Sequence, residues 1–150
     1  MIVRPLTPAL SLAIALTGCS HIATTSPLPS AQPTLTGHWT LVSASKLDTV
    51  PAGEISLHVR SAAAGDNRRL SATGYAGVNQ YVATVTLADG QRIQFGPPAT
   101  TRRAGSPERM DFERAFLKEL EGVAVYTLTA DQLELKTLHG DTLLFSPRPE

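Results

Sequence analysis

The chain has 150 residues, of which 42% are hydrophobic and 17% are charged, so it can bury one modest core, whereas two large domains are excluded. Lys plus Arg number 13 and Asp plus Glu number 13, so no net charge favours nucleic acid, and the 5% of aromatic residues supply few stacking platforms for bases. The composition therefore predicts no nucleic-acid partner.

The first 18 residues have the organisation of a lipoprotein signal peptide. A short basic start, Met1–Arg4, precedes the apolar run Ala9–Leu16, which is too short to span a bilayer as a permanent helix. The following Leu-Thr-Gly-Cys at 16–19 resembles the lipobox of bacterial lipoproteins, in which the cysteine sulfur carries the lipid. Cys19 is the only cysteine of the chain, so we expect lipidation there. The alternative is an ordinary secretory signal with an incidental cysteine.

Residues 19–34 have the composition of a flexible tether. Pro27, Pro29 and Pro33 disfavour both a helix and a central strand. Ser20 stands where, in the lipoproteins that this segment resembles, an aspartate favours retention in the inner membrane. We therefore expect palmitate-type acyl chains to anchor the protein in the outer membrane, facing the periplasm, with surface exposure left open. The membrane is an expected partner through this N-terminal lipid anchor.

Alternation of apolar and polar residues predicts strands in most of the region 35–147, the expected domain. Ala88-Asp89-Gly90 has the composition of a hairpin turn, and the last three strands form a meander. The predicted strands are Leu35–Leu41, Ile55–Val59, Tyr81–Leu87, Ile93–Phe95, Val123–Leu128, Leu133–Leu138 and Thr142–Phe145.

One segment departs from this period and predicts a helix from Pro107 to Leu120. Ser106 supplies an N-cap, Pro107 suits the first helical position, and apolar residues follow at helical spacing. Gly122 supplies a stop. Many strands with one late helix predict a mainly β fold, a barrel-like antiparallel sheet capped by the helix.

Five phrases occur in order between Leu35 and Phe145 and coincide with those of one known family. They are LTGHWTL at 35–41, GYAGVNQY at 74–81, TRRAG at 101–105, MDFERAFLKEL at 110–120 and the terminal hairpin from 133 to 145. Together they resemble the META domain family, also called HslJ-like. The resemblance implies a small lipocalin-like antiparallel β-barrel and no established catalytic chemistry. The matching motif residues, expected to be structural, are Gly37, Trp39, Gly74, Gly77, Asn79, Tyr81, Thr101, Arg102 and Glu113.

Two positions depart from the family pattern. Val78 and Gly105 stand where the family has cysteines. If those cysteines form a disulfide, the resemblance implies that this chain lacks about 2 to 4 kcal/mol of stabilisation, which packing must replace. We expect a domain that is insensitive to reductant.

Several candidate sites have structural alternatives that we favour. GYAGVNQY lacks the lysine and the following helix of a phosphate-binding loop, so it is interpreted as a strand connection in which Asn79 bonds local main chain. Glu113 is interpreted as a structural acid four residues after Arg109. The histidines, which lack the close partners that a zinc site needs, are His21, His38, His58 and His139. No metal site or cofactor is expected.

Two basic doublets, Arg68-Arg69 and Arg102-Arg103, could meet anionic lipid or polysaccharide, and a solvated surface is the alternative that we favour. The functional expectation is a non-enzymatic envelope lipoprotein that contributes to envelope homeostasis or stress tolerance. Its alternative is a hydrophobic-ligand carrier or a pilotin-like chaperone of another envelope protein. An apolar cavity would favour the carrier, and its expected lining is Trp39, Leu57, Val85 and Phe116.

Overall fold

The computed structural model of the chain describes residues 34–47, 49–51, 55–62 and 66–148. The expectations for the signal peptide, for Cys19 and for the tether up to residue 33 lie outside these residues. The elements in chain order are β1 (Gly37–Ala44), β2 (Ser56–Ser61), β3 (Arg69–Tyr75), β4 (Gln80–Ala88), β5 (Arg92–Phe95), β6 (Ala99–Thr100), α1 (Pro107–Glu121), β7 (Val123–Leu128), β8 (Leu133–Thr137) and β9 (Thr142–Pro147).

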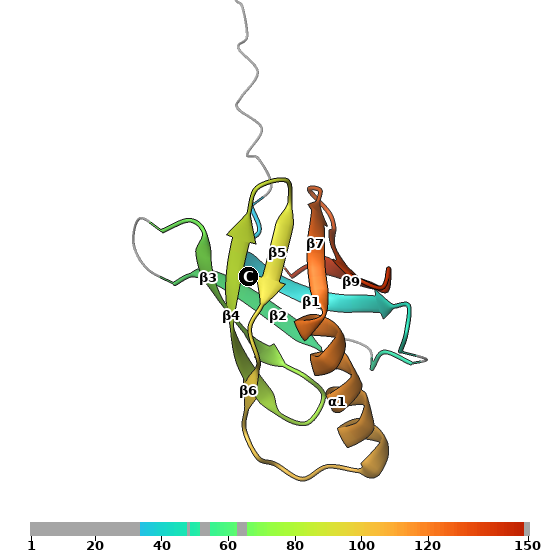
Figure 1. Ribbon diagram of the computed structural model, residues 1–150. Coiled ribbons are helices and arrows are strands. Elements are labelled where there is room, and N and C mark those ends of the chain that lie inside the picture. The colour runs from blue at the N-terminus through green and yellow to red at the C-terminus, as the bar shows by residue number, and fades with distance from the viewer. Residues whose placement is uncertain (1–33, 48, 52–54, 63–65, 149–150) are drawn as a thin grey trace, which may run out of the picture. The chain divides into compact units, whose positions relative to one another are not determined.

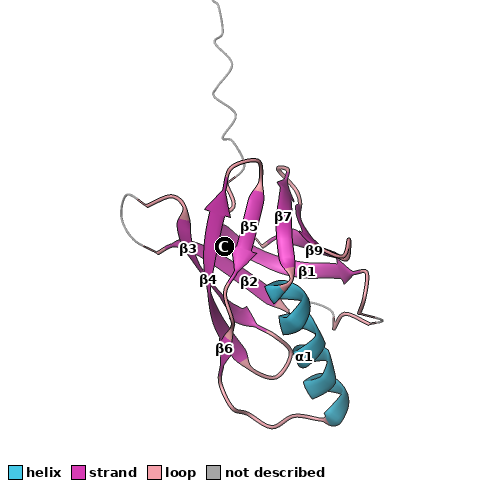
Figure 2. Cartoon of the chain, viewed as in Figure 1, coloured by secondary structure: helices cyan, strands magenta, loops and turns pink. Residues whose placement is uncertain are grey.

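Eight of these strands close into an antiparallel barrel (Figures 1 and 2). The order around the barrel is β1-β2-β3-β4-β5-β7-β8-β9, and β9 pairs with β1 to complete it. The short β6 pairs with the first part of β4, while β5 pairs with its last part. The predicted mainly β fold with one late helix is therefore confirmed, as are the hairpin between β4 and β5 and the C-terminal meander.

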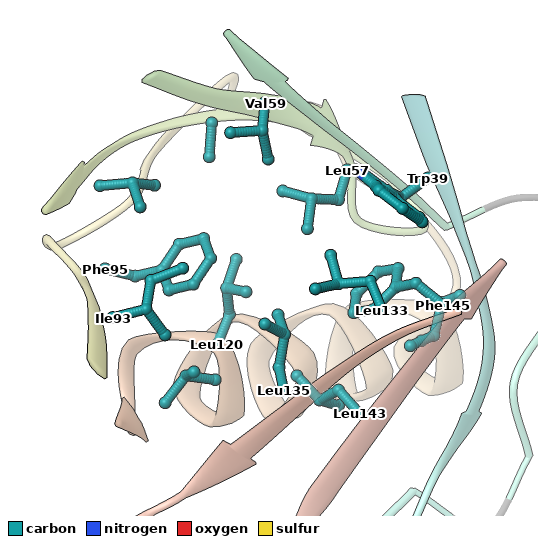
Figure 3. Close-up of a cluster of buried hydrophobic side chains, with 14 of the residues drawn as sticks. Trp39, Leu57, Val59, Ile93, Phe95, Leu120, Leu133, Leu135, Leu143 and Phe145 are labelled. Carbon is teal, nitrogen blue, oxygen red and sulfur yellow. The ribbon is translucent and has the colours of Figure 1, made fainter. Parts of the chain in front are cut away.

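Apolar side chains fill the inside of the barrel (Figure 3). The inward residues of β4 alternate as the sequence predicts, because Tyr81, Ala83 and Val85 are each at most 3% exposed. From the helix, Phe116 and Leu120 enter the same core. Burial of each large apolar side chain stabilises the fold by about 1.5 to 3 kcal/mol, so this shared core holds the helix to the barrel.

The helix begins as predicted and ends one residue later. Ser106 is its N-cap, and the Ser106 hydroxyl accepts a hydrogen bond from the backbone N–H of Arg109 at 3.4 Å. At the other end of the helix, Gly122 has a φ of −78°, in the right-handed region, so the helix ends there without a left-handed residue. Its backbone N–H instead donates to the carbonyls of Lys118 and Glu119, both at 3.1 Å.

Two strands had no counterpart in the sequence prediction. β3 carries only two buried apolar residues, Leu70 and Ala72, among polar ones, so its alternation is weak. β6 has only two residues and exists through its pairing with β4. Neither strand has a strong local signal, because each is stabilised mainly by neighbours that come from elsewhere in the chain.

Within the part of the chain that the structure describes, no helix is both long enough and apolar enough to cross a lipid bilayer.

Candidate functional site

The family-motif carboxylate Glu113 lies buried between the helix and the barrel, with 6% of its surface exposed. Its Oε2 accepts hydrogen bonds from the backbone N–H groups of Val78, at 3.1 Å, and Asn79, at 2.6 Å. Its Oε1 accepts one from the Asn79 side-chain amide at 2.8 Å. A buried carboxylate is costly unless it is hydrogen-bonded, and here three donors meet it.

Asn79 connects this carboxylate to the loop between β6 and α1. Its Oδ1 accepts hydrogen bonds from the Thr101 hydroxyl at 2.8 Å and from the Arg103 backbone N–H at 2.7 Å. These partners lie 22 to 34 residues away in the sequence, so the expectation of local main-chain bonding by the Asn79 side chain is wrong. We call the group Val78, Asn79, Thr101, Arg103 and Glu113 the clasp.

The glycines and tyrosines of GYAGVNQY shape the strand connection that delivers Asn79 to the clasp. Gly77 has a φ of +117°, a backbone conformation that residues with a side chain rarely adopt. A Cβ at Gly74 would collide with the carbonyl oxygen of Ser56. That same carbonyl accepts a hydrogen bond from the Tyr81 hydroxyl at 2.9 Å, and burial raises the pKa of Tyr81, so the phenol stays a neutral donor.

The remaining motif residues lie away from the clasp or at its margin. Gly37 and Trp39 belong to β1, where the Trp39 indole N–H donates to the Leu35 carbonyl at 3.0 Å. Arg102 is exposed in the loop before the helix. The motif thus combines barrel positions with clasp positions.

Val78 and Gly105, which replace the two family cysteines, lie against each other. A Cβ built on Gly105 would stand 3.5 Å from the Cβ of Val78 and 2.7 Å from its Cγ2. A separation of about 3.5 to 4.5 Å between Cβ atoms is normal for a disulfide. In this chain the valine side chain occupies the space beside the glycine instead.

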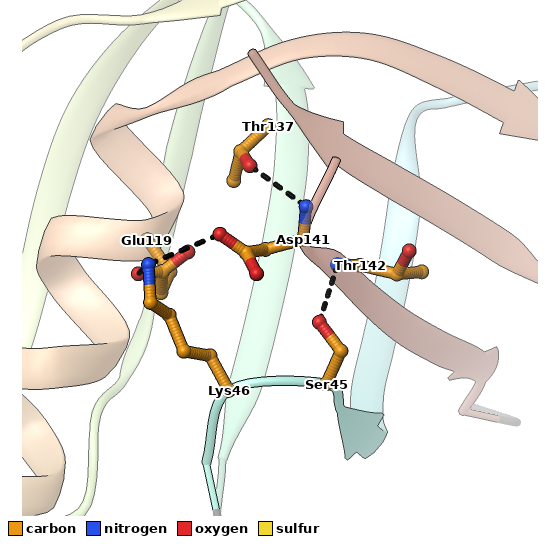
Figure 4. A network of polar contacts seen from close by, with 6 residues as sticks. All are labelled: Ser45, Lys46, Glu119, Thr137, Asp141 and Thr142. Carbon is orange, nitrogen blue, oxygen red and sulfur yellow. Dashed lines mark hydrogen bonds and ion pairs between the residues drawn. The ribbon is translucent and has the colours of Figure 1, made fainter. Parts of the chain in front are cut away.

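A second polar network ties the other end of the helix to the barrel (Figure 4). The Lys46 ammonium lies 3.1 Å from Asp141 Oδ2 and 3.4 Å from Glu119 Oε1. A hydrogen bond and attraction to Asp141, followed by attraction to Glu119, raise the pKa of Lys46. We call these three residues the lysine network. No sequence pattern connects its members, because they come from three separate segments of the chain.

A groove of about 670 Å³ lies on the outer face of the strands opposite the core. One row of paired residues crosses its floor from β1 to β6: His38, His58, Thr73, Val82 and Ala99. The two imidazoles stack, with ring centroids 3.5 Å apart and planes inclined by 20°. His58 therefore lies on the outer face, as predicted.

The two basic doublets lie at opposite ends of β4, because Arg69 pairs with Thr86 whereas Thr100, just before Thr101 and Arg102, pairs with Tyr81. Arg68 pairs with Asp89 at 3.1 Å in an exposed contact, while Arg103 uses its backbone to join the clasp. Among the described residues, no group of three or more His, Cys, Asp or Glu side chains could hold a metal ion.

The comparisons with known proteins agree with this architecture. The model of the META domain family matches residues 32–150. The fold is similar to an NMR structure of a protein from Burkholderia xenovorans, at 25% identity and a TM-score of 0.61, covering 98% of this chain and 100% of that one. A second NMR structure matches at 20% identity and a TM-score of 0.49, covering 74% of this chain and 88% of that one. No curated protein matches the chain. Since the family model covers most of its length, the chain belongs to the META domain family.

Proposed function

We propose that the chain is a lipid-anchored envelope protein whose META domain acts by binding at its outer surface and not by catalysis. The filled interior carries the binding part of this proposal. Trp39, Leu57, Val85 and Phe116, which would have lined an apolar cavity in a hydrophobic-ligand carrier, are at most 5% exposed and pack in one core. A bound molecule would have to displace that core, so contacts at the surface are favoured.

The clasp supports the non-enzymatic part. Glu113 is the motif residue with the chemistry of a general acid or base, but its oxygens already accept three protein hydrogen bonds. Moving a proton to or from a substrate would require breaking bonds that position the helix. Neither the META family nor the similar structures give a sign of enzymatic activity.

The anchor is tested by metabolic labelling with palmitate in cells that express the wild type or Cys19→Ala. We expect label in the wild type and none in the variant, with the wild type in the outer-membrane fraction. Label that persists in Cys19→Ala would overturn the anchor.

The surface-binding part needs a separate experiment. A photo-crosslinking amino acid is placed at Val82, which is 47% exposed in the groove, and in a matched protein at Val125, which is 39% exposed on β7. Crosslinks formed in intact envelopes at Val82 and absent at Val125 are the expected result. Equal labelling at both positions, or labelling at neither, would contradict binding through this face and leave the palmitate result unaffected.

A further inference from the structure

The groove on the outer face concentrates basic and hydrogen-bonding groups. Arg60 lies two residues after His58 on β2, so both side chains leave the same face of the sheet, and His38 pairs directly with His58. Around them the lining offers hydroxyl and amide groups from Thr73, Gln80 and Thr100. The groove thus presents several donors around one arginine.

Among the described residues, the charged groups around the histidine pair are all positive, because Arg148, whose backbone N–H donates to the His38 carbonyl at 2.8 Å, lies beside His38 as well. Besides the two histidines and Arg60, the described lining of the groove contains two titratable groups, Tyr75 and Tyr81, and no carboxylate. Both tyrosine hydroxyls donate to backbone carbonyls, that of Tyr75 to Gly77 at 2.7 Å and that of Tyr81 to Ser56 at 2.9 Å. Protonation of the imidazoles would therefore add positive charge to a groove that already holds Arg60.

An anionic ligand would favour protonation of the stacked pair. Neutral imidazoles can stack at 3.5 Å, but two imidazolium rings at this distance repel each other, and Arg60 adds to the repulsion. An anion in the groove offsets this repulsion, so its binding and proton uptake support each other. A chelated metal fits less well, because rings within 20° of parallel direct their nitrogen lone pairs side by side and not at one point.

We propose that this groove binds a ligand that carries an oxyanion of the phosphate or sulfate ester class, and that it binds more tightly when the histidine pair is protonated. Arg60 suits such a group, because a guanidinium donates two parallel hydrogen bonds to an oxyanion. The volume of about 670 Å³ and the apolar part of the floor at Val82 and Ala99 leave room for an uncharged organic part. This inference rests on the proposed surface-binding function and names its ligand class.

The test is a calorimetric titration of the purified full chain with glucose 6-sulfate, whose charge does not change between about pH 5.5 and pH 8, the range in which histidine titrates. Glucose serves as the neutral control ligand. We expect dissociation constants at least about tenfold lower at the acidic pH, and no binding of glucose. No binding of the ester at either pH would overturn the proposal, and so would an affinity that is the same at both.

Variants assign the effect to residues. Arg60→Gln should weaken binding at both pH values, while Arg114→Gln, an exposed arginine on the helix, should leave it unchanged. The double variant His38→Phe with His58→Phe keeps two stacked rings and should lose the pH dependence. Circular dichroism checks the folding of this double variant. If it does not fold, the comparison of Arg60→Gln with Arg114→Gln and the pH dependence of binding by the wild type still test the proposal. Binding that survives Arg60→Gln intact would contradict the assigned site.

A vesicle experiment separates the two sources of such a ligand. The ligand would be a lipid headgroup if the protein sediments with vesicles of phosphatidylcholine plus phosphatidylglycerol but not with vesicles of phosphatidylcholine alone. Arg60→Gln should then abolish this sedimentation. Binding of the sugar ester without vesicle binding would assign a soluble ester or a glycan. All of these measurements use purified protein, so their failure would leave the palmitate and crosslinking results intact.

Discussion

The helix is tied to the barrel by two polar regions of different character, the clasp near its middle and the lysine network near its C-terminal end. In the clasp a 6% exposed carboxylate meets two backbone N–H groups and an amide. In the lysine network the Lys46 side chain is 57% exposed and bridges two acids. A helical glutamate can therefore be a rigid anchor or a minor contact, depending on how far its partners are removed from water.

The largest loss of stability is expected for Glu113→Gln. The variant keeps the shape of the side chain but places an NH₂ group against N–H donors of Val78 or Asn79. We expect the free energy of unfolding to fall by about 2 to 4 kcal/mol, because buried donors lose their acceptor. Urea denaturation measures this, with the exposed Glu121→Gln as matched control. Equal stability of the two variants would show that Glu113 contributes no more to stability than an exposed glutamate.

The second-largest change in stability is expected when a disulfide is introduced next to the clasp. The double variant Val78→Cys with Gly105→Cys should form a disulfide, since the Cβ separation of 3.5 Å is suitable. When oxidised it should gain about 2 to 4 kcal/mol over its own reduced form. The wild type, whose only cysteine is Cys19, should melt at the same temperature with and without dithiothreitol. A double variant that stays reduced under oxidising conditions would refute the packing described for these two positions.

A smaller loss is expected for Gly77→Ala. The nearest side-chain atoms, on Ile55 and Phe112, would be 3.6 Å from the new methyl group, so space is available and the cost is conformational. The positive φ of +117° predicts a loss of about 1 to 2 kcal/mol in the free energy of unfolding. Gly90→Ala, at a positive φ in an open turn, is the control for strain without the clasp. If the two losses are equal, the delivery of Asn79 to the clasp adds nothing to the cost at Gly77.

The smallest effect belongs to Lys46→Met, because the lysine is largely in water and salt screens its ion pairs. Its pKa is raised above 10.5, so its contribution is complete below that value and is lost as the pH rises through the raised pKa. The free energy of unfolding should therefore differ little between variant and wild type in high salt, and at moderate salt the difference should vanish as the pH rises through the raised pKa of Lys46. A loss in the free energy of unfolding as large as that of Glu113→Gln would show that the lysine network stabilises the helix as strongly as the clasp does.

The elements with strong local signals could be predicted from the sequence, and their contacts could not. Ser106 and Pro107 mark the helix start, and the alternation in Tyr81–Leu87 marks a strand, because both signals arise within a few residues. The clasp depends on where Glu113 meets Asn79 across 34 positions. The stacking of His38 on His58 depends on the register of β1 against β2. The alternation in each strand fixes which face a side chain takes, but a shift of the register by two residues would preserve the faces and separate the two rings.

The motif residues around Glu113 hold the helix to the barrel. Amide hydrogen exchange at Asn79 measures this contact, because the Asn79 N–H donates to Glu113 Oε2 at 2.6 Å. In Glu113→Gln the Asn79 amide should exchange about 30- to 1,000-fold faster than in the wild type, which corresponds to about 2 to 4 kcal/mol at 1.36 kcal/mol per tenfold. In Glu121→Gln its rate should not change. An Asn79 amide that exchanges equally slowly in all three proteins would contradict the claim.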